Sequence, residues 1–525
     1  MLKAAVVAMA LGAITWGAAA GAYQYAVPGK TADGKDLTAY LWVPPQADRI
    51  RGVLVGGMAT SVEPVLCDDP VIRKACADEK LAIVYFAPHI DPLFGRDKGN
   101  PQEQLQQALN DLAELSGYRE IAVAPLFPFG HSISTVYASR LATLMPDRCF
   151  GVLLHKGGIA VPTGQQAGAL AGVPILAIKG QFEEFGPGPN GVLRDFEDRQ
   201  AAWKTMRDTL LRLRAADPRH LLSLWVEPGA THFAWADYEA PVVAMFIRAC
   251  AQNRIPDWPA DAREPVQCLA IDPAKGQTQK APGDDAQGDL WHLNGELARA
   301  IEASHAQMNR KPQFVTFADP ATKKPILPGH DLRLKLTPRW TGPDTFKAAA
   351  VFLDSPPAKY PPVEGQVGHA DGPVEINIYG GQLERVSADE FRVKLDPRRR
   401  MEGNLLAVHR GDATYRYAEQ AAIVSIPRKL TAGKPQTIAF PPAGPLRLGG
   451  GAVKLAATSD SGLPVRYYVE SGPAQIDGDE LKVVDVPAKA KFPMKITLVA
   501  YQYGSAVEPL VQSAEPVRQE IVLER

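Results

Sequence analysis

Cysteine is scarce in this sequence, and neither sign of charge is in excess. Five cysteines occur among 525 residues, and 57 basic residues face 58 acidic ones. This balance gives no electrostatic reason to expect a nucleic acid or an anionic membrane as a partner. The one basic cluster, residues 398–400 behind Asp396 and Pro397, is expected to form a solvated turn. No group of Cys, His and carboxylate residues has the spacing of a metal site, so neither a metal nor a cofactor is predicted.

The few cysteines would still form disulfides in an exported protein. In an oxidising compartment the economical pairs are Cys67 with Cys76 and Cys250 with Cys268, which leaves Cys149 free. The sequence leaves this connectivity open, and it leaves the oligomeric state open as well.

Long apolar runs are also absent, apart from one at the N-terminus. Met1, Leu2 and Lys3 precede an apolar stretch that runs from residue 4 to about residue 16, and small residues follow up to Ala22. This arrangement predicts a signal peptide over residues 1–22 that is removed on export. The run is at the short limit for a membrane span, and an uncleaved anchor is the alternative. We therefore expect a secreted or periplasmic protein with no membrane partner after cleavage.

Residues 40–256 alternate short apolar runs with amphipathic stretches. The runs are bounded by turn residues, as strands covered on both faces require, and they lie at residues 52–55, 81–87, 126–129, 150–154, 174–178 and 221–226. Helical periodicity appears between them, at residues 101–115, 135–144, 194–214 and 240–251. Strands that alternate with helices in this way predict a mostly parallel sheet with helices on both faces.

Residues 256–311 contain proline and glycine breakers and then one amphipathic helix, expected from residue 290 to about residue 308. Trp291, Leu297 and Ile301 are available for one apolar face of this helix. A long linker is the alternative, but the apolar face favours packing on the preceding sheet. Residues 23–311 are therefore expected to form one domain.

After residue 311 the helical periodicity nearly vanishes and alternation with a period of two takes over. Apolar and basic residues alternate at residues 332–336, and similar alternation recurs at residues 374–378 and 391–395. This alternation, with turn residues at regular spacing, predicts β-sandwiches. Two all-β sandwich domains are expected, over residues 312–428 and 429–525.

The last of these segments has two recognisable stretches, Gln-Thr-Ile at residues 436–438 and Ser-Gly-Leu-Pro-Val at residues 461–465. It resembles the bacterial immunoglobulin-like domains of secreted proteins. The resemblance implies an immunoglobulin-like β-sandwich and says little about function. Packing inside the fold or across strands is expected, rather than a sugar-binding platform, for the tyrosines Tyr467, Tyr468, Tyr501 and Tyr503.

Residues 127–134, with the sequence Phe-Pro-Phe-Gly-His-Ser-Ile-Ser, join a predicted strand to a predicted helix. A nucleophilic serine at such a junction, here Ser132, must lie on a very tight turn, and small residues two positions before and after it prevent clashes. Gly130 meets this requirement, whereas Ser134 stands where glycine is usual. A helix N-terminus also presents backbone N–H groups to negative charge on a substrate. The alternative is that Ser132 is an ordinary helix N-cap.

Residues 40–256 together resemble the α/β-hydrolase superfamily, in which nucleophile, acid and base follow one another in this order along the chain. In the resemblance the acid lies three residues after the glycine that closes the penultimate strand. That position is Glu183, and the adjacent Glu184 is the alternative. The oxyanion hole should use the backbone N–H groups of Ile133 and of Met58 or the glycine before it.

The base of this family lies in the loop after the last strand. His232 occupies such a glycine-containing loop and is the predicted base. Three other histidines are neighbours in this arrangement. His131 is expected to orient the turn or to line the pocket, and His89 and His155 could contact substrate.

These residues predict an exported serine hydrolase that cleaves carboxylic esters through an acyl-enzyme on Ser132. Because β-sandwiches are common on extracellular enzymes that attack polymers, a polysaccharide ester or a polyester is the candidate substrate. Peptidases and acyltransferases use the same constellation, and the sequence does not separate them from esterases. The alternative is a non-catalytic exported binding or adhesion protein on a degenerate hydrolase scaffold, which Ser134 and the size of the β-rich half support.

Overall fold

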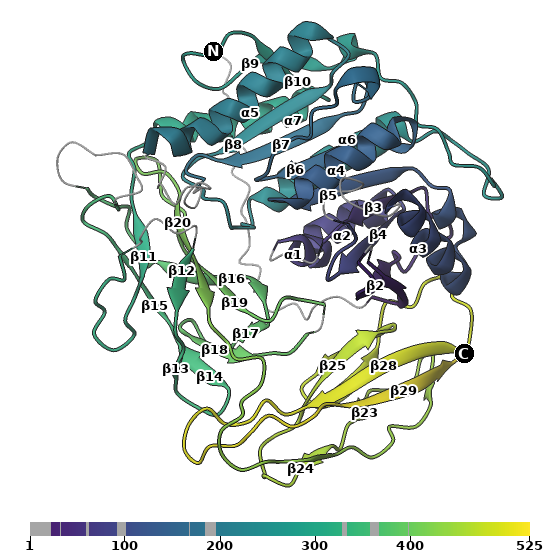
Figure 1. Cartoon of the computed structure of the whole chain (residues 1–525), viewed down its shortest axis with the longest axis vertical. Helices are drawn as coiled ribbons and strands as arrows, with labels where there is room; N and C mark the ends of the chain where they lie inside the picture. Colours follow the sequence, from purple (N-terminus) through teal and green to yellow (C-terminus); the bar gives the residue numbers. More distant parts are fainter. Residues whose placement is uncertain are drawn as a thin grey trace, which may run out of the picture.

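The computed structural model of the chain describes most of its residues: 23–31, 33–58, 62–91, 101–166, 168–183, 196–327, 333–357, 367–396 and 398–525. The expected signal peptide, residues 1–22, and the alternative acid Glu184 lie outside the described residues. An α/β part comes first, and strand-rich parts follow and lie against it (Figure 1). Within the described ranges, no helix has both the length and the apolar character needed to cross a membrane.

The N-terminal part is built on one eight-stranded sheet with the strand order β1-β2-β4-β3-β5-β6-β7-β8. The pairs β1–β2 and β2–β4 are antiparallel, and all other pairs of this sheet are parallel. The mostly parallel sheet is as predicted, whereas the hairpin β1–β2 begins before the predicted region. The strands are β1 (Tyr25–Lys30), β2 (Asp36–Trp42), β3 (Gly52–Gly56), β4 (Leu81–Ala87), β5 (Leu126–His131), β6 (Val152–His155), β7 (Ile175–Gly180) and β8 (Leu222–Glu227).

Helices cover both faces of this sheet. They are α1 (Glu63–Asp68), α2 (Pro70–Asp78), α3 (Pro101–Ser116), α4 (Ser134–Leu144), α5 (Phe196–Ala216), α6 (Glu239–Arg254) and α7 (Gly295–His305), with 3₁₀ turns η1 (Arg119–Ala122), η2 (Pro146–Arg148), η3 (Gly164–Gln166), η4 (Pro273–Lys275) and η5 (Ala306–Asn309). The chain moves one way along the sheet after β3 and the other way after β4. Right-handed crossovers therefore place α2 on one face and α3, α4 and α5 on the other. α6 packs beside α2 and α7.

The segment after α6 lies against β8. It contains β9 (Gln277–Lys280), β10 (Asp289–His292) and α7, and Trp225 Nε1–H of β8 donates to Ser304 Oγ at 2.9 Å. The expected start of the helix at residue 290 is wrong, because that residue belongs to β10. The helix begins at Gly295, where Asn294 Oδ1 caps it by accepting the Leu297 N–H at 2.9 Å.

Residues 312–428 are strand-rich and form several small sheets, with the orders β12-β20-β19-β16, β13-β14-β18-β17 and β11-β15. The alternation at residues 374–378 and 391–395 corresponds to β16 and β18, in which Ile376, Phe391 and Val393 are buried. The number of sandwiches stays a prediction. The strands are β11 (Val315–Ala318), β12 (Leu334–Leu336), β13 (Arg339–Trp340), β14 (Thr345–Lys347), β15 (Ala349–Phe352), β16 (Glu375–Gly381), β17 (Leu383–Arg385), β18 (Glu390–Val393), β19 (Gly403–His409) and β20 (Ala418–Val424).

Residues 429–525 also form small sheets, with the orders β22-β29-β28-β25, β23-β27-β26 and β21-β24. The likeness to immunoglobulin-like domains stays a prediction. Tyr467, Tyr501 and Tyr503 are buried, and Tyr468 is half-buried, so these tyrosines pack inside the fold as expected. The strands are β21 (Ile438–Ala439), β22 (Leu446–Arg447), β23 (Val453–Lys454), β24 (Thr458–Ser459), β25 (Arg466–Ser471), β26 (Ala474–Asp477), β27 (Glu480–Val483), β28 (Met494–Tyr501) and β29 (Val517–Glu524).

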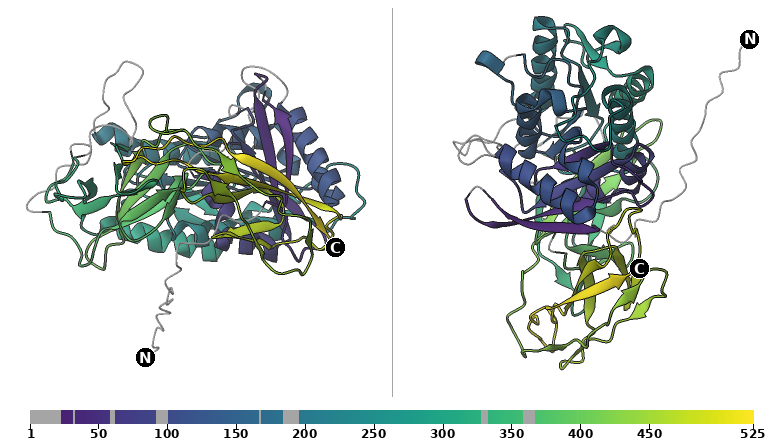
Figure 2. Two further views of the ribbon diagram at one scale, coloured as in Figure 1. Left: turned by 90° about the horizontal axis from the view of Figure 1, so that it is seen from below. Right: turned by 90° about the vertical axis from the view of Figure 1, so that its right-hand side faces the viewer.

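The C-terminal strands lie beside the N-terminal end of the large sheet (Figures 1 and 2). Gly472 N–H donates to Tyr23 O at 2.8 Å, and Ala488 N–H donates to Pro45 O at 2.9 Å. One apolar cluster runs from the large sheet into this last segment. The first and last described parts of the chain are therefore joined by backbone hydrogen bonds and by a shared core.

Two predictions about charged and sulfur-containing residues are wrong. All five cysteines are free thiols, and burial raises the pKa of each. The basic cluster is not a solvated turn, because Arg398 is buried against Asp396 and its Nη2 lies 2.8 Å from Asp396 Oδ2. Arg399 Nη2 donates to Asp68 Oδ2 at 2.7 Å. This bond joins the strand-rich residues 312–428, called the middle part below, to α1. Arg400 is exposed.

Candidate active site

Ser132 lies on a tight turn between β5 and α4. Its φ is +56°, a value that residues other than glycine rarely adopt and that marks a strained position. Two glycines leave room for the turn. A Cβ at Gly130 would lie 2.3 Å from Ser134 O, and a Cβ at Gly157 would lie 2.2 Å from Ser132 O. The Ser132 N–H donates to His155 O at 3.0 Å and ties the turn to the end of β6.

Ser134 has a structural role at this turn. Its side chain is fully buried, and its hydroxyl donates to the Glu63 carboxylate of α1. The His131 N–H in turn donates to Ser134 Oγ at 2.9 Å and to Glu63 Oε1 at 3.2 Å. Ser134 therefore belongs to a hydrogen-bonded anchor at the position where glycine is usual. Its presence is not a sign of a degenerate hydrolase site.

His232 reaches Ser132 from the loop after β8. His232 Nε2 lies 2.8 Å from Ser132 Oγ, which is hydrogen-bond distance. Burial lowers the pKa of His232 below its ordinary value of 6.5, and Glu183 opposes part of this shift. The imidazole is therefore neutral near pH 7. With its proton on Nδ1, its Nε2 lone pair can take the proton of the serine hydroxyl.

Glu183 lies behind the imidazole, as the prediction requires of the third residue. Its Oε2 lies 3.4 Å from His232 Nδ1 and 2.7 Å from Lys179 Nζ, and its Oε1 accepts the Gly180 N–H at 3.0 Å. Burial alone would raise the pKa of Glu183, but the Lys179 ammonium and the contact with His232 outweigh burial and hold this pKa at about 2. Glu183 is thus a carboxylate near neutral pH.

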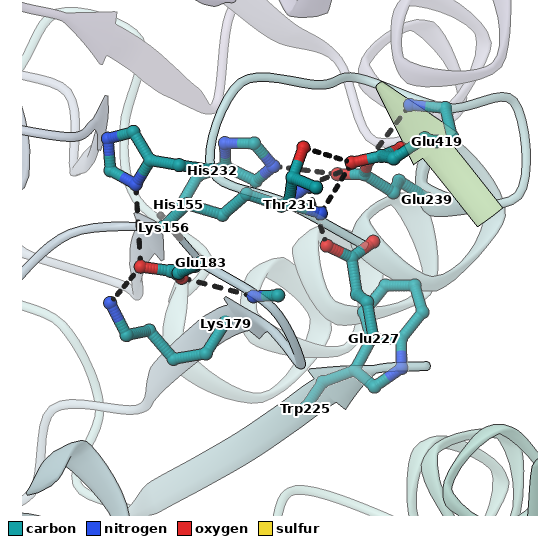
Figure 3. A network of polar contacts seen from close by, with 12 residues as sticks. His155, Lys156, Lys179, Glu183, Trp225, Glu227, Thr231, His232, Glu239 and Glu419 are labelled. Atoms are coloured by element: carbon teal, nitrogen blue, oxygen red, sulfur yellow. Dashed lines mark hydrogen bonds and ion pairs between the residues drawn. The ribbon is translucent and has the colours of Figure 1, made fainter. Parts of the chain in front are cut away.

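A second buried group of charges lies beside this triad (Figure 3). Lys156 Nζ lies 2.9 Å from Glu227 Oε2 and 3.7 Å from Glu239 Oε1, and all three side chains are completely buried. Burial raises the pKa of Glu227 to about 8 and that of Glu239 to about 7. Near pH 7 the two carboxyls therefore share about one proton, and the ammonium balances the remaining negative charge.

The donor atoms of His155, Glu227 and Glu239 lie within 4.8 Å of one another, close enough to hold a metal ion. The Lys156 ammonium, however, already contacts both carboxyls. It supplies the positive charge that two buried carboxyls need, so the arrangement fits an ion-pair cluster better than a metal centre.

His131 and His155 join the cluster to the serine turn. Their Nδ1 atoms lie 2.9 Å apart, and His155 Nε2 lies 2.7 Å from Glu239 Oε2. Burial and the Lys156 ammonium lower the pKa of His155 to about 3. Both histidines are 1% exposed, so His155 lies inside the fold and does not provide the substrate contact considered for it. The centroid of the His131 ring lies 5.2 Å from that of the His232 ring.

The predicted oxyanion donors stand at the same edge of the sheet. Ile133 directly follows the predicted nucleophile at the start of α4. Met58 lies two residues beyond the end of β3, whose Gly56 pairs with Phe129 of β5, and it forms a bridge with His89. Because parallel strands end at a common edge, Met58 and Ile133 lie at the same edge of the sheet, at the point where the direction of the connections reverses.

The structure brings Ser132, His232 and Glu183 together, although each comes from a different loop. Sequence reasoning missed the residues behind them: Glu63, Lys156, Lys179, Glu227, Glu239 and also Glu419, which lies on β20 and accepts a hydrogen bond from the Thr231 hydroxyl at 2.8 Å. A signal for one of them was present, because Glu227 ends a run that is otherwise almost entirely apolar. An ionisable side chain at the end of a buried strand is destabilising unless it forms an ion pair or hydrogen bonds.

The strand order, the two antiparallel strands at its start, and the strained serine between β5 and α4 define an α/β-hydrolase fold in the N-terminal part. No family model and no curated protein matches the sequence. The class therefore rests on the topology of the chain itself and on the geometry around Ser132.

Three solved structures are similar to this one at low identity. S-formylglutathione hydrolase FrmB from Staphylococcus aureus is 11% identical, with 43% of this chain and 98% of that chain covered and a TM-score of 0.29. Siderophore hydrolase EstB from Aspergillus nidulans is 13% identical, with 49% and 99% covered and a TM-score of 0.30. The esterase domain of a Rhodothermus marinus protein is 15% identical, with 43% and 97% covered and a TM-score of 0.28.

Proposed function

We propose that the protein is a serine hydrolase that cleaves carboxylic esters through an acyl-enzyme on Ser132. The observation that carries the proposal is the 2.8 Å contact between His232 Nε2 and the hydroxyl of a serine with a φ of +56°. Glu183 stands behind the imidazole and keeps its negative charge. A hydroxyl, a neutral imidazole and a carboxylate in this order are the parts needed to activate a serine.

The reaction follows from these positions. His232 Nε2 accepts the Ser132 proton while Oγ bonds to the ester carbonyl carbon, and the carbonyl oxygen becomes an oxyanion. The backbone N–H groups of Ile133 and Met58 are the proposed donors to it, and one such donor is typically worth about 10²–10³ in rate. His232 then returns the proton to the leaving alcohol as the C–O bond breaks. A water molecule repeats the sequence on the acyl-enzyme and releases the acid, and Ser132 regains its proton.

Glu183 has two functions in this mechanism. Its Oε2 holds the Nδ1–H side of the imidazole and so selects the tautomer that leaves Nε2 free to act as a base. Its negative charge stabilises the imidazolium that forms when His232 takes the serine proton. Lys179 keeps this carboxylate ionised and fixed in place.

Export and the substrate class belong to the same proposal. The short basic start and the apolar stretch up to about residue 16 support export to the periplasm or the medium. The strand-rich parts support a polymeric ester, either a polysaccharide ester or a polyester, as the substrate. A panel of acyl and glycosyl esters, tested with purified protein, identifies the preferred class.

The test of the activity compares the parent protein with Ser132→Ala. Hydrolysis of p-nitrophenyl acetate should fall by about 10⁶-fold, because the nucleophile is lost while the fold is kept. A fluorophosphonate probe should label the parent at Ser132 and leave the variant unlabelled. Parent-like turnover by Ser132→Ala would show that another group does the chemistry. A folded parent that neither labels nor hydrolyses any ester would favour the non-catalytic binding protein instead.

A further inference from the structure

The loop that carries His232 is pressed against a strand of the middle part. Gly229 has a φ of +73°, and a Cβ on it would lie 1.8 Å from Tyr417 O, beside the start of β20. Ala230 and Ala234 of the loop share a buried cluster with residues of β16, β19 and β20, among them Ala421. The backbone of the loop and that of the strand are therefore in direct contact, with no room for a side chain at residue 229.

Glu419 of β20 binds the residue next to the proposed base. Its Oε1 accepts the Thr231 N–H at 2.6 Å and the Thr231 hydroxyl at 2.8 Å, and its Oε2 accepts the Tyr417 hydroxyl at 2.7 Å. The carboxylate is 3% exposed. Hydrogen bonds to a carboxylate are shorter and stronger than bonds between neutral groups, so this contact holds the Thr231 backbone firmly.

The residue on the other side of His232 is also held from the middle part. The Arg333 guanidinium lies over the Phe233 ring, 4.1 Å from its centroid, and Arg333 Nη1 donates to Asn404 Oδ1 at 3.0 Å. The Phe233 ring in turn meets the His232 ring edge-on, with centroids 4.6 Å apart. Both neighbours of His232 in the sequence are thus held by the middle part. Glu419 binds Thr231, and Arg333 packs on Phe233.

We propose that Glu419 is a positioning residue for His232, so that the middle strand-rich part completes the active site. The inference rests on the proposed function, because it assigns Glu419 to the same serine reaction. Glu419 acts through the Thr231 backbone and does not touch the reacting atoms. A misplacement of about 1 Å in a reacting group can cost about 10²-fold in rate, so an anchor one residue away from the base has a direct effect on turnover.

The sharpest test is Glu419→Gln, which keeps the shape of the side chain and removes its charge and one of its two acceptor oxygens. We expect kcat to fall by about 10-fold and KM to stay within about twofold, because the variant loosens the base and not the substrate. Glu375→Gln is the matched control, since Glu375 is an exposed glutamate of β16 in the same sheet, and it should leave kcat unchanged.

The partner of Glu419 provides a second set of variants. Thr231→Val removes the hydroxyl that donates to Glu419 and should lower kcat, whereas Thr231→Ser keeps that donor and should restore most of it. In the double variant Glu419→Gln with Thr231→Val, the two losses should multiply only in part, because both changes affect the bond between the Thr231 hydroxyl and Glu419, whereas Thr231→Val leaves the backbone N–H in place. Losses that multiply fully would show that the two residues act independently and would overturn the proposal.

Hydrogen exchange at residues 228–233 provides a readout that needs no turnover. Glu419→Gln should speed exchange of the Thr231 amide by about 10-fold or more, and Glu375→Gln should not. Faster exchange together with lower kcat supports the proposal, and unchanged exchange overturns it whatever kcat does. If the parent hydrolyses no ester, the proposed function fails by itself, and the exchange rate alone then decides whether Glu419 anchors the loop.

Discussion

Replacement of Lys156 by methionine should destabilise the protein in a way that depends on pH. Methionine has a similar length and no charge, so it leaves Glu227 and Glu239 without their ammonium partner. The two carboxyls are completely buried and share about one proton near pH 7 when the lysine is present. Without it, the second carboxyl must also take up a proton before it can be buried.

The magnitude follows from the pKa values that the two carboxyls have while the lysine is present, about 7 for Glu239 and about 8 for Glu227. Near pH 5 both carboxyls are therefore already neutral in the parent, and loss of the ammonium requires no further proton uptake there. Each pH unit above about 7 costs the variant about 1.36 kcal/mol more than the parent for a Glu239 that must stay neutral, which is about 2.7 kcal/mol near pH 9. The folded pKa is raised further in the variant, so the extra cost appears as pH rises above the parent's folded pKa.

The assay is thermal or urea unfolding of the parent and of Lys156→Met near pH 5 and near pH 9. The loss of stability in the variant should be clearly larger near pH 9. Lys74→Met is the matched control, because Lys74 pairs with Asp78 on the surface with 74% of its side chain exposed, and it should change stability little at either pH. An equal loss for Lys156→Met at both pH values would mean that packing, and not charge, explains the effect.

Two further predictions concern the proposed catalytic residues. The acid limb of the kcat/KM profile should have its midpoint below pH 6.5, because burial lowers the pKa of His232 and activity needs the neutral imidazole, which is lost as pH falls through that pKa. Glu183→Gln should lower kcat by about 10⁴-fold by allowing the wrong imidazole tautomer, whereas Glu184→Gln should keep most of the activity. Equal losses in the two variants would refute the choice of Glu183.

Much of the N-terminal fold could be predicted from the sequence, because its strands are short apolar runs enclosed by helices. The runs at residues 52–55, 81–87 and 126–129 fall within β3, β4 and β5. The hairpin β1–β2 could not be predicted in this way. β1 contains Pro28 and Gly29 and is only partly buried, so it lacks the apolar signal that marks the central strands.

The three residues of the proposed triad could be predicted because each follows a strand of the same sheet. The residues that hold the triad in place could not be predicted, because their contacts join distant parts of the chain and follow no local sequence period. Thr231 and Glu419 are 188 residues apart, and Ser134 and Glu63 are 71 apart. The cysteines show the same limit, because sequence spacing indicated economical pairs whereas all five thiols are free in the structure.

The two carboxyls that pair with lysines at this edge of the sheet have pKa values that are shifted in opposite directions, although each lysine lowers the pKa of its partner. Lys179 Nζ lies 2.7 Å from Glu183, whose pKa is about 2, and Lys156 Nζ lies 2.9 Å from Glu227, whose pKa is about 8. The two distances are nearly equal, so the difference between the two pKa values arises from the surroundings of the carboxyls. Burial raises the pKa of both carboxyls. Glu227 also faces a second buried carboxyl, whereas Glu183 faces the His232 imidazole.

The low pKa of Glu183 determines the slope of the acid limb of the kcat/KM profile. Because Glu183 keeps its charge down to about pH 2, the loss of kcat/KM on acidification should reflect one proton, taken up by His232. A logarithmic slope of one is therefore expected between the His232 midpoint and the pH at which the fold is lost. A slope of two would mean that Glu183 takes up a proton in the same range, and the assignment of Lys179 as the residue that keeps it ionised would be wrong.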